Sequence, residues 1–256
     1  VSNQYLHDLY RFFKLSVRRH EFRDIFKEKL DLHHIPALSN VLYSEDILFP
    51  IADFYLKKER WNEAIEVYEE METIGALQGR GAEYYQKLGY ALQKNKKYAE
   101  AIDAYLKADT LKPDNIWNNR HLAICYRLNR NYQAALSYYK KVEEATPEDT
   151  NVIFHIGSCL AELGQYEEAA NYFFKLDFIE SNCIKAWRGI GWCSFISRKY
   201  EQAMKYYEKI IEQKPLAIDY MNAGHVAWTM GDIQKAAALY GKSITANGNR
   251  ERFLEM

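Results

Sequence analysis

The sequence lacks the features that mark membrane proteins and nucleic-acid-binding proteins. No run approaches the roughly 18 to 20 consecutive apolar residues that a membrane-spanning helix needs. Its 34 Lys and Arg are balanced by 35 Asp and Glu, which leaves a formal net charge of −1. A dedicated nucleic-acid binder usually needs a strong excess of positive charge. We therefore expect no membrane span and no nucleic-acid partner.

Cysteine is also scarce, with 4 residues in the chain. Cys125, Cys159 and Cys193 are each 34 residues apart, so they occupy one equivalent position in successive repeats. Equivalent helices of stacked repeats lie at least about 8–10 Å apart, whereas a disulfide needs Cα atoms within about 4.4–6.8 Å. We expect free thiols in tight helix packing, and no zinc site, because no C-x-x-C spacing occurs. Free thiols favour a reducing compartment, which predicts a cytoplasmic protein.

The motifs of common catalytic chemistries are missing as well. There is no Gly-rich phosphate loop, no H-E-x-x-H and no G-x-S-x-G. Acid pairs such as Glu143-Glu144 and Glu167-Glu168 have lysines nearby, as expected for a solvated helix face. We predict no catalytic residues, no metal site and no cofactor, and hence no enzyme activity in this chain.

What the sequence does contain is a repeat with a step of 34 residues. An aromatic residue is followed by alanine three residues on, by tyrosine or phenylalanine four beyond that, and in most copies by a closing proline. The clearest copies are Tyr98, Ala101, Tyr105 and Pro113; Tyr132, Ala135, Tyr139 and Pro147; Tyr166, Ala169 and Phe173; and Tyr200, Ala203, Tyr207 and Pro215. Self-similarity with this period is typical of a solenoid.

The repeats divide the chain into six units between two flanking segments. The predicted units are 45–78, 82–115, 116–149, 150–183, 184–216 and 217–250. Each has two helical patterns of about a dozen residues joined by a short polar turn, such as Asn129-Arg130. We expect N-terminal capping helices in 1–44 and the start of a truncated C-terminal helix in 251–256. The chain begins at Val1 and shows no signal-peptide pattern, so we expect a fragment of a longer protein.

The first helix of each unit adds its own positions to the pattern. In the second unit these are Tyr85, Leu88, Gly89 and Leu92, followed by Ala101, Tyr105, Ala108 and Pro113. Together they resemble the tetratricopeptide repeat. This resemblance implies an all-α, right-handed superhelical solenoid of antiparallel helix pairs. The pentatricopeptide repeat, an RNA-reading relative, has a period of 35 and lacks this Gly/Ala–Ala–Pro pattern.

In tetratricopeptide proteins the residues beside the core positions of the first helix face the concave side. Applied here, the resemblance predicts a partner-binding groove formed by Tyr90, Trp117, Arg120, Ile124, Arg127, Asn151, Phe154, Lys185, Arg188, Trp192, Phe195, Met221, His225 and Trp228. Aromatic residues and Arg dominate binding hot spots. The alternative is that these rings pack on one another.

We predict a non-catalytic scaffold that binds a peptide or helix of a partner protein in this groove. Arg120, Arg127, Lys185 and Arg188 would favour acidic groups of that partner through charge-assisted hydrogen bonds. A second hypothesis is a regulatory or assembly arm of a larger enzyme or signalling protein whose activity lies elsewhere. RNA binding by stacking on Tyr and Trp is a weaker third hypothesis, because the net charge is near zero. The oligomeric state stays open.

Overall fold

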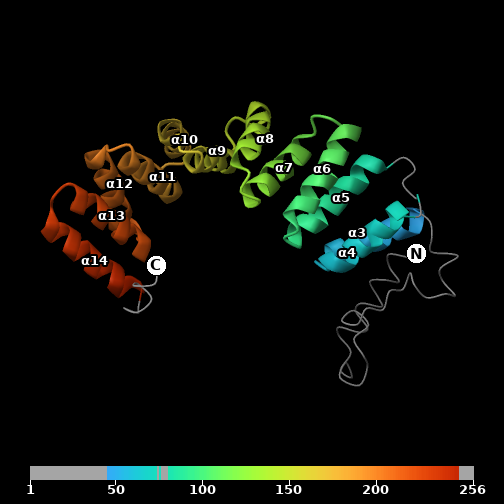
Figure 1. Ribbon diagram of the computed structural model, residues 1–256, viewed down its shortest axis with the longest axis horizontal. Helices are drawn as coiled ribbons and strands as arrows, with labels where there is room; N and C mark the ends of the chain where they lie inside the picture. The colour runs from blue at the N-terminus through green and yellow to red at the C-terminus, as the bar shows by residue number, and fades with distance from the viewer. Residues whose placement is uncertain (1–44, 74, 76–79, 248–256) are drawn as a thin grey trace, which may run out of the picture. The chain divides into compact units, whose positions relative to one another are not determined.

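The computed structural model describes residues 45–73, 75 and 80–247 (Figure 1). The twelve elements in these ranges are all α-helices. They are α3 (Glu45–Lys57), α4 (Trp61–Thr73), α5 (Gly81–Lys94), α6 (Tyr98–Leu111), α7 (Ile116–Leu128), α8 (Tyr132–Ala145), α9 (Thr150–Glu162), α10 (Tyr166–Ile179), α11 (Ile184–Ile196), α12 (Tyr200–Gln213), α13 (Ala217–Thr229) and α14 (Ile233–Asn247). The predicted all-α architecture of paired helices is confirmed. The capping helices expected in 1–44 and the helix start expected in 251–256 lie outside the described residues.

The chain forms two compact units, residues 1–125 and 126–256, with the boundary inside α7. In the first unit α3 packs on α4, α4 on α5 and α5 on α6. In the second unit each helix from α8 to α14 packs on the next one along the chain. Both units are therefore successions of helix pairs, as Figure 1 shows.

The two helices of a pair are joined by turns in which one residue adopts the left-handed backbone conformation, with positive φ. Lys96, Arg130 and Arg198 have φ values of 64°, 61° and 60°, and Gly164 and Gly231 have 77° and 84°. These residues lie in the polar turns predicted from the sequence. Glycine adopts this conformation without the steric cost that other residues incur, so the turns at 164 and 231 are the least strained.

Glycine in the first helix of a pair lets the aromatic ring of the second helix lie against its backbone. A Cβ on Gly89 would lie 2.8 Å from the Tyr105 ring, and a Cβ on Gly224 would lie 2.6 Å from Tyr240. Neither separation leaves room for a methyl group. The small residue at this position therefore lets the two helices approach closely.

The core runs along each unit between the helices. One cluster in the second unit joins Ile153 and Leu176 to Cys183 and Ala186, with Phe154 packed on its edge. All four cysteines are buried and free, which confirms the prediction for the three that share one repeat position. Burial raises the pKa of the Cys125 thiol to about 12 and those of Cys159 and Cys193 to about 11. These thiols are core packing groups.

Within the described ranges, no helix combines the length and the apolar character needed to cross a bilayer.

Candidate functional site

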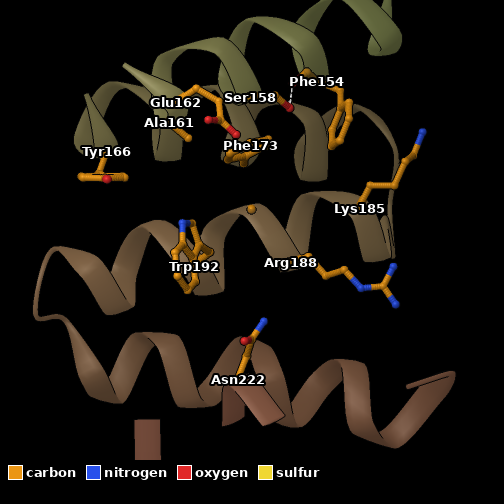
Figure 2. Close-up of a pocket in the computed structure, with 11 residues that line it drawn as sticks. Phe154, Ser158, Ala161, Glu162, Tyr166, Phe173, Lys185, Arg188, Trp192 and Asn222 are labelled. Carbon is orange, nitrogen blue, oxygen red and sulfur yellow. Dashed lines mark hydrogen bonds between the residues drawn. The ribbon is translucent and has the colours of Figure 1, made fainter. Parts of the chain in front are cut away.

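The second unit contains a hollow of about 580 Å³ between α9, α10, α11 and α13 (Figure 2). We call this hollow the α9–α11 pocket. It is lined by Phe154, Ser158, Ala161, Glu162, Tyr166, Phe173, Lys185, Arg188, Gly189, Trp192 and Asn222. The mixture of four aromatic rings with charged and amide groups suits binding, because rings supply area and polar groups supply orientation.

Two helix starts fix the orientation of the pocket walls. α9 begins after Asp149, whose side chain accepts hydrogen bonds from the backbone N–H groups of Asn151 (3.0 Å) and Val152 (3.1 Å). Such N-capping satisfies donors that have no partner inside the helix. In the first turn of α13, Asp219 accepts a 2.8 Å hydrogen bond from the backbone N–H of Leu216. Both caps are local sequence signals.

A change at one repeated position accounts for the aromatic floor of the pocket. In the first unit the His121 ring stacks on Tyr105, with ring centroids 5.7 Å apart. In the second unit, one repeat later, His155 stacks on Tyr139 at 5.5 Å. The next residue in the series is Gly189, so no side chain from this position stacks on the corresponding ring, Phe173.

The Phe173 ring instead lies directly against the backbone of α11. A Cβ on Gly189 would lie 2.5 Å from that ring, and a Cβ on Gly157, on α9, would lie 2.9 Å from it. The ring is therefore held between two glycines. Phe173 forms the floor of the pocket, and Figure 2 shows it among the other lining residues. Phe154 packs beside it, with ring centroids 6.0 Å apart.

Arg188 is held by an acid of its own chain. Its Nε donates to Asp219 Oδ1 and its Nη2 to Asp219 Oδ2, both at 2.7 Å. The Asp219 side chain is only 1% exposed, and its hydrogen bonds raise the pKa of Arg188 further. We predicted that Arg188 would engage acidic groups of a partner. The structure gives it an internal acid instead, because Asp219 follows at the start of α13 and is too deeply buried to remain unpaired.

Lys185 and Glu162 carry the other charges of the pocket. The Lys185 ammonium lies 5.8 Å from the centroid of the Phe154 ring, a cation–π contact. Glu162, the last residue of α9, is exposed. Neither side chain forms an ion pair with any other described residue. Both charges are therefore available to a ligand.

The predicted groove residues of the second unit divide between this pocket and other places. Phe154, Lys185, Arg188 and Trp192 line it, and the Trp192 side chain is 41% exposed. The other six lie outside the lining. Three of them contact side chains of their own unit: Arg127 donates to the Tyr139 hydroxyl (3.4 Å), Phe195 packs on Trp192 and Tyr200, and His225 contacts the Tyr240 hydroxyl (2.8 Å). Of the remaining three, Asn151 is exposed on the first turn of α9, Met221 is half-buried and Trp228 is 58% exposed.

In the first unit the predicted aromatic residues pack mostly on one another. Tyr90 contacts Trp61 and Trp117, with centroids 6.1 and 6.2 Å apart. The ring centroids of Trp117 and His121 are 4.0 Å apart, and Trp117 is 43% exposed. The two remaining predicted residues, Arg120 and Ile124, are half-buried on the same helix. In this unit the aromatic side chains follow the alternative to a partner-binding groove, in which the rings pack on one another.

Seven residues of the pocket were not among those predicted from the sequence: Ser158, Ala161, Glu162, Tyr166, Phe173, Gly189 and Asn222. Phe173 and Tyr166 were assigned only to the repeat pattern. The series His121, His155, Gly189 was a usable signal, because a repeated position that changes from a ring to no side chain lets a neighbouring ring lie against the helix backbone.

Burial lowers the pKa of two histidines, His155 in the second unit and His121 in the first. Burial is the main reason that the pKa of His155 is lowered to about 4, and the nearby cations Arg127 and Lys185 lower it further. The pKa of His121 is lowered to about 4 for the same main reason. In the described part of the chain, no three His, Cys, Asp or Glu residues gather as a metal site would require.

Comparisons with known proteins agree with the fold. Models described as "Tetratricopeptide repeat" match residues 48–78, 82–115, 127–193, 184–215 and 220–250. None of the curated proteins matches the sequence.

Three solved structures illustrate the structural similarity. A tetratricopeptide repeat protein from Parabacteroides merdae ATCC 43184 is 20% identical over 78% of either chain, with a TM-score of 0.66. YrrB, titled a TPR protein with an unusual peptide-binding site, is 20% identical over 73% of this chain and 95% of its own, with a TM-score of 0.59. MamA is 18% identical over 69% of this chain and 97% of its own, with a TM-score of 0.61. At these identities the similarity establishes the fold alone.

Proposed function

Because the chain belongs to the tetratricopeptide repeat family, we propose that it is a non-catalytic scaffold that binds a peptide or helix of a partner protein in the α9–α11 pocket. The observation that carries the proposal is Trp192, an exposed indole beside a hollow with an aromatic floor. Large exposed rings around a concave surface are typical of interaction sites. YrrB, which has the same fold, is described as having a peptide-binding site.

The proposal places the acidic group of the partner at Lys185. Of the four cations predicted for that task, Arg188 is held by Asp219 and Arg127 by the Tyr139 hydroxyl. Lys185 forms a cation–π contact with the Phe154 ring and no ion pair with any other described residue. An ammonium over an aromatic face can still bind a carboxylate, since it has three N–H donors and the ring does not occupy all of them.

A random 12-residue peptide library displayed on phage would test the site directly. We expect the protein to enrich peptides with an apolar anchor, and Trp192→Ala to weaken the enriched peptides at least about tenfold, as for a hot-spot residue. Affinities would be measured by fluorescence anisotropy on synthetic peptides.

Phe178→Ala is the matched control, because Phe178 is 89% exposed on α10 and does not line the pocket. It should leave affinity unchanged. Failure to enrich any peptide, or equal affinities for wild type and Trp192→Ala, would contradict the proposal.

A further inference from the structure

The α9–α11 pocket has charges of opposite sign at its two ends. Lys185 lies beside Phe154, where α9 and α11 begin, and Glu162 lies beside Tyr166, where α9 ends (Figure 2). The Phe173 floor lies between these ends, and the Trp192 indole lies toward the end that Tyr166 lines. A ligand that fills the pocket therefore meets a cation, then an apolar surface, then an anion.

The stability of the helices does not explain these two charges. A helix carries partial positive charge at its N-terminus and partial negative charge at its C-terminus. Lys185 is in the first turn of α11, which has no acid, and Glu162 is in the last turn of α9, which has no base. Each charge therefore opposes its own helix dipole, and neither has an ion-pair partner among the residues that the structure describes.

The same placement favours a ligand with complementary charges. At the end where α9 and α11 begin, the helix dipoles add to the positive potential of Lys185. Where α9 ends, its dipole adds to the negative potential of Glu162. Tyr166 and Trp192 line the same end of the pocket, and an aromatic face beside a carboxylate is a favourable surrounding for an ammonium or guanidinium group.

We propose that the pocket selects peptide segments in which one apolar side chain stands between an acidic and a basic residue, with the acid at Lys185, the apolar group on Phe173 and the base at Glu162. The inference rests on the proposed function and adds a charge pattern to it. Arg188 has a supporting part only, because both oxygens of Asp219 already hold its guanidinium.

Peptides of fixed composition test the charge pattern. One set would carry a central Phe with Glu on its N-terminal side and Lys on its C-terminal side, a second set the reverse order, and a third Gln at both positions. Each set would use spacings of one, two and three residues. We expect wild type to bind one charged order roughly three- to tenfold more tightly than the reverse order and the Gln peptides at low salt, as for exposed charge pairs. The difference should shrink when salt screens the charges.

The double variant E162K/K185E exchanges the two charges of the pocket and should reverse the preferred order. Its melting temperature should stay equal or rise, because both exchanged charges then complement their helix dipoles. An unchanged order of preference, or equal binding of the Gln peptides by wild type, would overturn the inference.

The same measurements separate the inference from the function on which it rests. If all Phe peptides bind equally and Trp192→Ala still weakens them, the pocket binds peptides without charge selection, and only the inference fails. If no peptide of any pattern binds, the proposed function fails with it.

Discussion

His155 shows how burial decides the charge of a single side chain. Its ring stacks on Tyr139, and its Nδ1 atom has no hydrogen-bond partner among the described residues. A protonated imidazole there would be a buried cation beside Arg127 and Lys185, with only Asp149 as a compensating charge. The folded state therefore keeps the ring neutral at pH 7, and His155 acts as an aromatic packing group.

This state predicts that His155 makes the protein less stable in acid. The folded pKa is about 4, whereas the unfolded chain protonates His near its ordinary pKa of 6.5. Between these values the unfolded state binds more protons, so stability falls as pH falls through that window. His155→Phe keeps the stacked ring and removes the titration.

Urea unfolding at pH 7 and pH 4.5 would measure the effect. We expect wild type to lose about 1–2 kcal/mol more than His155→Phe, after allowance for partial solvent screening. Equal losses would mean that the His155 ring is solvated in the folded state.

The helix pair is the level at which the sequence was most informative. A position that must be small because a ring lies against it recurs from repeat to repeat, and such local patterns can be recognised without coordinates. The turns also follow from local residue types. Long-range contacts were less accessible: Arg188 and Asp219 are 31 residues apart, and no local pattern pairs them.

Substitution of glycine by alanine should change the stability of the protein in opposite directions at Gly157 and at Gly241. Gly157→Ala should destabilise the protein by roughly 1–3 kcal/mol, because overpacking costs about that much. The Phe173 ring lies 2.9 Å from the new Cβ and cannot retreat, since the Gly189 backbone lies on its other side. Gly241→Ala, inside α14 with no atom within 4 Å of the new Cβ, should stabilise by up to about 1 kcal/mol through helix propensity.

Thermal unfolding of the two variants beside wild type would check both signs. A stabilised Gly157→Ala variant would show that the pair can open to admit a methyl group. A destabilised Gly241→Ala variant would show that propensity does not govern α14.

Across the chain, family and fold were predictable because repetition multiplies a weak local signal. The pocket was only partly predictable because it arises where the repetition fails. Gly189 replaces the histidine of the two preceding repeats, and its consequence depends on where the Phe173 ring lies in three dimensions. Whether a Lys or Arg among the described residues pairs with Glu162 likewise depends on the packing of the helices, which the periodicity of the sequence does not reveal. Departures from the repeat are therefore as informative as the repeat itself.

Stacked helix pairs contact mainly their neighbours, so the stability of such a protein is approximately a sum of local contributions. Arg188→Met removes the partner of Asp219, a buried carboxylate that then keeps only the hydrogen bond from the Leu216 N–H. Leaving a buried charge unpaired costs about 3–5 kcal/mol, and partial exposure of Arg188 places the expected cost at the lower end. We expect hydrogen–deuterium exchange to accelerate in α11, α12 and α13 while protection in α3 to α6 stays unchanged. A uniform loss of protection along the chain would instead indicate all-or-none unfolding, in which distant repeats open together.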